Sequence, residues 1–545
     1  MADMTFDVVC VGAGNKNLAF GCWATKYGGL SVAMFDERHE AGAGWSSEES
    51  PAPGFIADHC SHIHGRDMHH GFLLQDFPEA DVMAESSVHP VFTAMVFEED
   101  QSWIGRYGYQ YDPTQEKTYK SIAQFSQKDA DTYMWMLQKA GQYWGPAIFE
   151  AAWDLTKGPD EPDAIELMIK NPDSGWKSEY ERMTPAQFAA EMFESPEMQM
   201  LAVRTGQSAG PMPDDPETAF LSINTFLQPD PMIHKGGAHN MTHVTSRIIQ
   251  ANGGKIFLNK KVEKILIRNG KATGVLLADG TEVEARIAVV CGSNVQDLVL
   301  ELTGPEYWSP DIVEGVKNVK ADMDCISWYT WALKEQPRYQ AESHNPDCHA
   351  SAYVCLGRKD MNYVLEECAR RRKGLWPDPE KFNMVINNWS IAEPSLAPSG
   401  LASVLTEQYV LPATAYSDRE WQEIAKRHAD ELIRFWGRYA PNVTWDNVIG
   451  YVPVTPYFTI LHSRSYLPDG AWTSLNVSAD QMGRNRPIPQ LSDLTKFPIE
   501  NLYPASSCWG GYVTGGTCHQ GYHVYKILAG KHGLRKSWEE NGRPF

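Results

Sequence analysis

The chain has 545 residues and a formal net charge of −21 at pH 7. This charge argues against nucleic acid as a partner, because phosphate-rich partners need a basic surface, and it gives no attraction toward anionic membranes. A hydrophobic fraction of 43% with 21% charged residues is typical of a globular protein of two or more domains, and no apolar run reaches the roughly 18–20 residues of a membrane-spanning helix.

The cysteines and the N-terminus indicate where such a protein works. The ten cysteines are scattered, and none forms a CxxC pair. Reduced, buried thiols in a cytosolic protein are therefore expected. Residues 1–4 are acidic in character and lead directly into an apolar stretch, so we expect no secretory signal. We expect a cytoplasmic protein without a membrane span, and a homodimer is common for this size.

The first 38 residues read as a strand, a glycine-rich turn, a helix and a second strand that ends on an acid. Residues 6–11 are a short apolar run, and Gly12 and Gly14 follow at once. Residues 18–27 can form a helix, and residues 30–35 are the next apolar strand. This order is the fingerprint of dinucleotide binding.

Each part of this fingerprint has a physical role. The glycines let the backbone approach a pyrophosphate, whose charge lies at the positive end of the helix. Asp36, at the end of the second strand, accepts hydrogen bonds from ribose hydroxyls and repels a 2′-phosphate, so FAD or NAD fits better than NADP. Asn17 stands where the third glycine is usual, so helix and strand are expected to pack less closely there.

The middle of the chain alternates between helical and strand patterns. Residues 85–225 look largely helical, with capping signals at Ser126 and Thr184. A further helix over residues 241–251 leads into strands joined by Asn269-Gly270 and by Asp279-Gly280, which are strong hairpin signals. This β-meander ends at Gly292, as expected of a sheet that covers the adenosine end of a nucleotide.

The C-terminal block again reads as strand, glycine-rich turn and helix. We therefore expect an α/β fold, in which a Rossmann-like domain is assembled from three chain segments and carries an inserted, mixed α+β substrate domain. The expected segments of the nucleotide-binding domain are residues 1–80, 231–300 and 491–545. The expected segments of the substrate domain are residues 81–230, mostly helical, and 301–490.

Three motifs together resemble the phytoene desaturase-like flavoproteins. The first is Val11 to Leu18, continued by Phe35 to Gly44; the second is Lys235 to Gly292; and the third runs from Pro487 to Gly515. This group contains carotenoid desaturases and isomerases and retinol saturase, and it lies within the FAD-dependent amine oxidase superfamily. The resemblance implies an FAD-dependent enzyme.

The resemblance also implies which residues contact FAD. Gly12, Gly14 and Asn15 are expected at the pyrophosphate. Asp36, Glu37 and Arg38 are expected at the adenosine ribose. Gly44, Trp45 and Ser46 are expected at the ribityl chain. Those expected at the adenine, at the end of the meander and around the flavin ring are Val262, Gly292, Ser507, Val513 and Thr514. The last two start a helix whose positive end would stabilise negative charge on the reduced flavin.

Departures from the family pattern lie near the flavin. Ala43 stands at a usual glycine, residues 505–507 read Ala-Ser-Ser, and Cys508-Trp509 replaces a His-Pro-like pair. The surface over the flavin ring is therefore expected to be unusual, which argues against a carotenoid substrate. Trp509 is interpreted either as a wall of the substrate slot or as a packing residue.

The leading functional hypothesis is removal of a hydride from a C–H bond of a hydrophobic, isoprenoid or alicyclic small molecule to flavin N5, with an unknown electron acceptor. His62 and His64 are the candidate bases, because histidine titrates near neutral pH. A flavin-passing loop fits these histidines better than a metal site, so no metal is expected. The alternatives are a redox-neutral isomerase or hydratase-like enzyme, and a non-enzymatic partner protein that kept the flavin fold.

Overall fold

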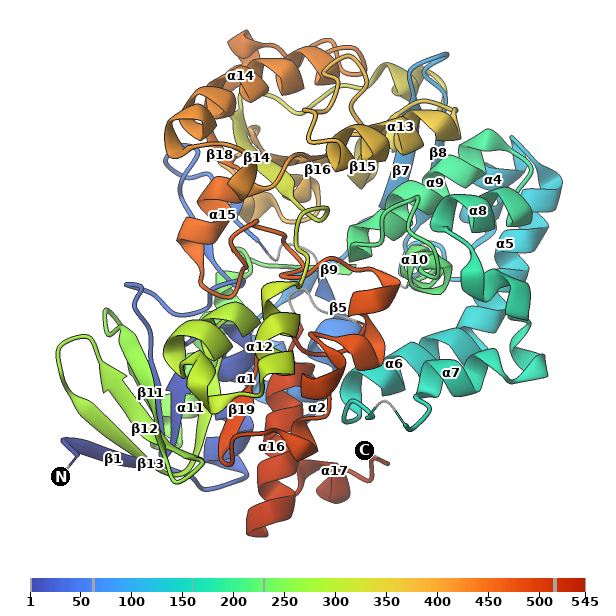
Figure 1. Ribbon diagram of the computed structural model, residues 1–545. Helices are drawn as coiled ribbons and strands as arrows, with labels where there is room; N and C mark the ends of the chain where they lie inside the picture. The colour runs from blue at the N-terminus through green and yellow to red at the C-terminus, as the bar shows by residue number, and fades with distance from the viewer. Residues whose placement is uncertain (1, 61–63, 159, 229–230, 513–516, 545) are drawn as a thin grey trace.

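Two seven-stranded sheets organise the chain. The computed structural model describes residues 2–60, 64–158, 160–228, 231–512 and 517–544 (Figure 1). The first sheet has the strand order β10-β2-β1-β13-β12-β11, with β19 also paired to β13. Its strands are β1 (Met4–Val11), β2 (Val32–Phe35), β10 (Lys255–Phe257), β11 (Val262–Arg268), β12 (Lys271–Leu277), β13 (Glu282–Cys291) and β19 (Leu502–Pro504).

This sheet is built from three distant parts of the chain, which confirms the expected fold class. Strands β2 and β13 flank β1 and run parallel to it, while β10 and β19 extend the parallel region on either side. Helix α1 (Asn15–Lys26) connects β1 to β2, and α16 (His519–His532) packs against α1. The exact domain boundaries stay a prediction.

The expected β-meander is present, and its first turn has the backbone that its sequence demands. Strands β11 and β12 are antiparallel and joined at Asn269 and Gly270, whose φ angles are 53° and 77°. Two successive positive φ values are the mark of a type I′ turn, which matches the twist of the flanking strands. An Asn-Gly pair adopts this turn at low steric cost.

The second sheet lies in the inserted region and has the order β18-β14-β17-β16-β15-β7-β8. Helix α14 (Asp418–Trp436) covers its outer face, where β-strand residues and α14 share one hydrophobic cluster (Figure 1). The strands are β7 (Val91–Phe97), β8 (Trp103–Tyr107), β14 (Ile326–Leu333), β15 (Ser351–Gly357), β16 (Val385–Asn387), β17 (Ala402–Tyr409) and β18 (Val448–Val454). Its inner face is turned toward the first sheet and the helices of residues 116–226.

Residues 81–230, expected to be mostly helical, also contain strands β7 and β8. Strand β7 pairs in parallel with β15, more than 250 residues later in the sequence (Val91 opposite Ser351, a separation of 260), and antiparallel with β8. Six of its seven residues are buried. A strand buried on both faces shows no alternation, so its apolar run cannot be distinguished from a buried helix by periodicity.

The remaining helices cover the two sheets. In the part of the chain that the structure describes, no helix is long and apolar enough to cross a membrane. The capping signals at Ser126 and Thr184 are confirmed, because each side chain accepts a hydrogen bond from the first turn of its helix. These helices are α2 (Gly71–Asp76), α3 (Pro78–Met83), α4 (Glu116–Ala123), α5 (Gln127–Lys139), α6 (Gly145–Trp153), α7 (Ala164–Ile169), α8 (Pro185–Met192), α9 (Pro196–Gly206), α10 (Ala219–Phe226), α11 (His239–Ala251), α12 (Pro310–Lys317), α13 (Met361–Arg372), α15 (Pro456–His462) and α17 (Ser537–Glu540).

Short strand pairs link the elements around the two sheets. Strand β3 (Ser47–Glu48) pairs with β4 (Ala57–Asp58). Strand β9 (Pro231–His234) pairs with both β5 (His64–Gly65) and β6 (Ser86–Ser87).

Asn17 has a role of its own at the turn between β1 and α1. Its Nδ2 donates to the backbone oxygens of Val11 and Gly12, at 2.9 Å and 2.8 Å. A Cβ on Gly292 would lie only 2.9 Å from the same nitrogen, so β13 closely approaches it. The amide therefore occupies the space left by the missing third glycine and joins the end of β1 to the start of α1.

We expect Asn17→Ala to lower the free energy of unfolding by about 1–3 kcal/mol, because one buried and one partly buried carbonyl lose their side-chain donor. Urea unfolding of the apoprotein measures this loss. Asn318→Ala, at an exposed helix end where the side chain bonds only Glu314, serves as the matched control and should change stability by less than about 0.5 kcal/mol. Equal effects of the two substitutions would contradict the assigned role of Asn17.

Candidate active site

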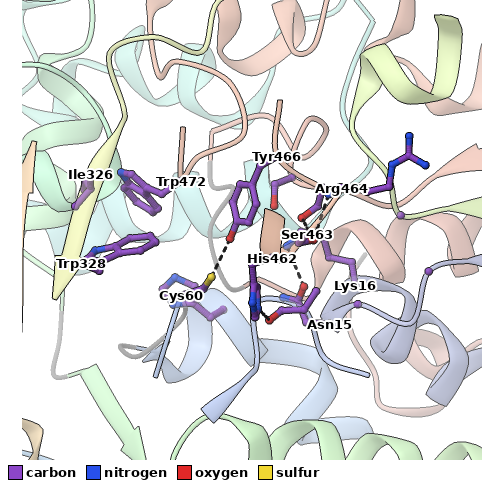
Figure 2. Close-up of a pocket in the computed structure, with 18 of the residues that line it drawn as sticks. Asn15, Lys16, Cys60, Ile326, Trp328, His462, Ser463, Arg464, Tyr466 and Trp472 are labelled. Atoms are coloured by element: carbon purple, nitrogen blue, oxygen red, sulfur yellow. Dashed lines mark hydrogen bonds between the residues drawn. The ribbon is translucent and has the colours of Figure 1, made fainter. Parts of the chain in front are cut away.

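A cavity of about 660 Å³ runs from the C-terminal edge of the first sheet to the inner face of the second (Figure 2). Most of the residues expected from the sequence to bind FAD line it. They are Gly12, Gly14, Asn15, Asp36, Glu37, Arg38, Gly44, Val262, Gly292 and Ser507. The structure thus brings together residues from all three segments of the nucleotide-binding domain.

Glycine is favoured in the turn after β1 by backbone conformation at Gly12 and by close packing at Gly14. Gly12 has a φ of +85°, and a Cβ on Gly14 would lie 3.3 Å from the Cβ of Ala43. Gly42 has a φ of +114°, and a Cβ there would lie 2.4 Å from the Thr242 hydroxyl. Because α1 begins at this turn without a side-chain cap, its N-terminal amides and positive dipole end face the cavity. A pyrophosphate fits this cradle.

Asp36 is held in position at the end of β2. Its Oδ2 accepts a hydrogen bond of 2.7 Å from the amide of Ala13, and its Oδ1 accepts one of 2.9 Å from the amide of Arg38. Each carboxylate oxygen keeps a further lone-pair site for a hydroxyl. The carboxylate therefore suits the ribose of an adenosine that lies along the edge of the sheet.

Trp45 and Ser46, also expected at the cofactor, are not among the described residues that line the cavity. The backbone oxygen of Trp45 accepts a hydrogen bond from the Thr242 hydroxyl at 2.9 Å and interacts with Nδ1 of His239 at 3.1 Å. Both Trp45 and Ser46 are buried, and the Ser46 hydroxyl lies 3.1 Å from Nε2 of His462. These contacts fix the loop that carries Gly44.

The segment from Leu461 to Tyr466 forms a wall of the groove that the sequence analysis missed. The backbone oxygen of His462 accepts a hydrogen bond of 2.9 Å from Arg38, and Arg464 forms ion pairs with Asp297 and Glu301. Burial lowers the pKa of His462 to about 4, so its imidazole is neutral at pH 7. This segment carries no recognisable sequence motif. It lies more than 400 residues after residues 36–46, and only the fold brings the two segments together.

Lys16 contributes a buried amine to the cofactor end of the cavity. Its Nζ lies 3.5 Å from Oδ1 of Asn15, and Figure 2 shows the two side chains next to each other. Burial lowers the pKa of Lys16 to about 8. Cys508, Cys518 and His519 are its nearby titratable neighbours, and burial keeps both thiols protonated and the imidazole neutral at pH 7.

The other end of the cavity is mainly aromatic and apolar. Ile326 and Trp328 of β14 face Trp472, and the Tyr466 hydroxyl donates to Sγ of Cys60 over 3.2 Å (Figure 2). Burial raises the pKa of Cys60 to about 11, so the thiol is protonated at neutral pH. The site therefore offers an apolar slot without a thiolate nucleophile at Cys60.

The structure describes only some of the expected catalytic residues and of the residues expected around the flavin ring. His62, Val513 and Thr514 lie outside the described residues, and His64 belongs to β5, where it pairs with Met232. Trp509 is 2% exposed, and its indole donates to the backbone oxygen of Leu491 at 3.0 Å. It is not among the described residues that line the cavity, which favours its interpretation as a packing residue.

Full-length relatives exist at low identity. No protein-family model matches the chain. Pyridine nucleotide-disulfide oxidoreductase domain-containing protein 2 of Mus musculus is 25% identical, over 95% of this chain and 93% of that protein. A limonene dehydrogenase component from Castellaniella defragrans is 23% identical, over 98% and 96%. A neurosporene-forming phytoene desaturase of Rhodobacter capsulatus is 42% identical over 166 residues, which cover 30% of this chain and 29% of the desaturase.

Solved structures show the same fold. An oxidoreductase from Methanosarcina mazei matches with a TM-score of 0.60 at 14% identity, over 96% of this chain and 100% of that one. A putrescine oxidase variant matches with a TM-score of 0.58 at 13% identity, over 97% and 99%. Cyclohexylamine oxidase from Brevibacterium oxydans matches with a TM-score of 0.55 at 13% identity, over 99% and 100%.

Fold, site and relatives agree on a class: the chain is an FAD-dependent oxidoreductase with the amine oxidase fold. Within that class, its resemblance to the phytoene desaturase-like flavoproteins is confirmed by its relatives. The cradle at Gly12 and Gly14 and the fixed carboxylate of Asp36 fit the diphosphate and ribose of this cofactor.

The lowered pKa of Lys16 predicts how FAD affinity changes with pH. Near a diphosphate its pKa rises above the value of about 8 that it has in the apoprotein, so FAD binding takes up a proton above that pH. We expect the FAD affinity of the apoprotein to be constant below pH 8 and to fall as the pH rises from 8 toward 10. Fluorescence titration with FAD at a series of pH values measures this slope.

Lys16→Met should weaken binding at pH 7 by about 10-fold and abolish the slope, because a charge-assisted contact is lost. Lys26→Met, at the far end of the same helix and paired with Glu79, should keep the slope of the native protein. An unchanged slope in the Lys16 variant would show that this amine does not contact the diphosphate.

Proposed function

We propose that the protein removes a hydride from a C–H bond of a hydrophobic alicyclic or isoprenoid small molecule. The single observation that carries this proposal is the continuity of the cavity, which joins the dinucleotide cradle to a slot walled by aromatic side chains. When bound, FAD supplies the two-electron acceptor. The chain supplies aromatic and apolar surfaces against which such a bond can be oriented.

The slot favours an apolar substrate by its aromatic area and by the neutral state of Cys60. Trp328 and Trp472 present large flat surfaces, and large aromatic side chains bury much apolar area without many rotatable bonds. The thiol of Cys60 is protonated at pH 7, because burial raises its pKa to about 11. The relation to a limonene dehydrogenase supports an alicyclic hydrocarbon skeleton as the starting point for assays.

We expect the purified holoprotein to lose its visible flavin absorbance when limonene or a related cyclic terpenoid is added without oxygen, because the electrons then remain on the cofactor. Absorbance recorded during the titration measures the reduction. Turnover that needs previously reduced flavin and consumes no acceptor would instead establish a redox-neutral enzyme. An unbleached flavin with every terpenoid and cyclic ketone tested would contradict the proposal.

The aromatic slot provides a second prediction. Trp328 is 4% exposed, and its replacement by Ala should weaken binding of the reducing terpenoid by about 10- to 100-fold through lost apolar contact. The substrate concentration that gives half-maximal flavin reduction measures the change, and the flavin content of the variant reports its folding. Trp445→Ala removes an exposed tryptophan that packs beside the outer face of the same sheet, so it should leave this concentration unchanged.

A further inference from the structure

The aromatic slot is formed by two segments that are distant in the sequence. Ile326 and Trp328 belong to β14, whereas Trp472 belongs to residues 472–477, a segment without helix or strand that we call the strap. Trp472 packs against the hydrophobic cluster that contains Ile326 and Trp328, and all three side chains line the cavity (Figure 2). The shape of the slot therefore depends on where the strap holds Trp472 relative to β14.

Asp324, which lies two residues before β14, contacts the strap at three positions. Its backbone oxygen accepts a hydrogen bond of 3.0 Å from the amide of Trp472. Its Oδ2 accepts one of 2.8 Å from the Thr473 hydroxyl and one of 2.9 Å from the amide of Val477. Because Asp324 directly precedes the strand in the chain, these bonds tie the strap to the strand that carries the other two side chains of the slot.

The side chain of Asp324 depends on the strap for its hydrogen bonds. It is 1% exposed, and a buried carboxyl group is costly unless donors satisfy it. Burial raises the pKa of Asp324 to about 7, while the hydrogen bonds from Thr473 and Val477 act in the opposite direction. The Thr473 hydroxyl is fully buried and also lies 2.7 Å from the backbone oxygen of Leu475, within the same strap. The carboxyl group and the strap therefore hold each other in place.

The backbone of the strap is strained and is fixed at further points. Ser474 has a φ of +67°, is fully buried, and donates from its hydroxyl to the backbone oxygen of Ser465 over 3.0 Å. Arg486 donates to the backbone oxygen of Thr473 over 2.7 Å. A left-handed residue other than glycine persists where its surroundings fix it, and such strain is concentrated at functional sites. Loss of one contact thus loosens the strap without detaching it.

We propose that Asp324 is a positioning residue of the substrate slot: through the strap it holds Trp472 against β14, and so it sets which shapes of apolar ligand the slot accepts. This inference rests on the proposed function, since it concerns the same cavity and the same class of ligand. A fixed aromatic surface favours a thin, flat ring over a compact, bulky one, because packed side chains resist the displacement that the bulkier ligand demands. A strap released from Asp324 lets Trp472 move and loses this discrimination.

Two isomeric hydrocarbons test the inference: limonene, which has a single ring, and α-pinene, which is a compact bicycle of the same atoms. Their dissociation constants for the holoprotein are measured by calorimetry, which needs no turnover. We expect the native protein to prefer limonene by about 10-fold, the size of a modest packing penalty. Equal binding of the isomers, or a preference for α-pinene, would contradict the inference. Since flavin bleaching is recorded separately, absent bleaching with a retained preference would contradict the proposed reaction and not the role of Asp324.

Variants of the two bonded side chains make the test specific. Asp324→Ala removes the acceptor, and Thr473→Val removes a donor while keeping the shape of the side chain, so it reports on the strap even where the alanine variant does not fold. Each should reduce the preference for limonene to about 3-fold or less, because the looser slot admits the bulkier isomer. Asp324→Asn keeps an oxygen that can accept from both donors, and Thr473→Ser keeps the hydroxyl, so both should retain the native preference.

Asp129 of α5 provides a matched control for loss of stability. It is fully buried and accepts hydrogen bonds of 2.8 Å from the amides of Glu194 and Ser195, and none of these three is among the described residues that line the cavity. Asp129→Ala should therefore lower stability, measured by urea unfolding, and leave the preference for limonene unchanged. An unchanged preference in Thr473→Val, or equal losses of preference in the two alanine variants, would overturn the inference.

Discussion

The parallel pairing of β1 with β2 and with β13 is the constraint on which the rest of the structure depends. Val11 lies opposite Phe35 on one side and Cys291 on the other, so the three strands end at the same level. The residues that follow them, Gly12, Asp36 and Gly292, therefore meet at one edge although 280 residues separate the first from the last (292 minus 12). Any slip in this register would disperse the cradle, because the carboxyl edge of a parallel sheet is where a ligand crevice forms.

The cavity has two chemically different ends that share one interior. At the cofactor end, backbone amides, a helix terminus and Lys16 face a space suited to a diphosphate. At the other end, the second sheet presents aromatic side chains with Arg204 and Glu407 among them. Burial keeps the thiols of Cys60 and Cys508 protonated and the imidazole of His462 neutral, so the chain mainly binds, orients and excludes water, and the cofactor supplies the redox chemistry.

The family pattern is altered in ways that the structure makes intelligible. Asn17 occupies the place of a glycine and ties β1 to α1 through two carbonyls, so the turn keeps its shape without the usual residue. Around Ala43, side chains contact the backbone oxygens of the loop: Thr242 and His239 contact that of Trp45, and His462 contacts that of Ala43. The contacting residues lie about 200 and more than 400 positions away in the sequence. The local sequence around Ala43 therefore does not predict these contacts.

The sequence by itself determined the dinucleotide fold, the cofactor and most of the residues that line the cradle, because these depend on short-range chemistry: glycines at a turn, an acid at a strand end and hairpin turns such as Asn269-Gly270. Only the tertiary structure decided which residues form the substrate end. Strand β7 shows no alternation because both its faces are buried, and the segment 461–466 carries no motif. Asp324 reads as an ordinary acid ahead of a strand until the fold brings residues 472–477 against it, since a contact between segments about 150 positions apart leaves no periodic pattern in either of them.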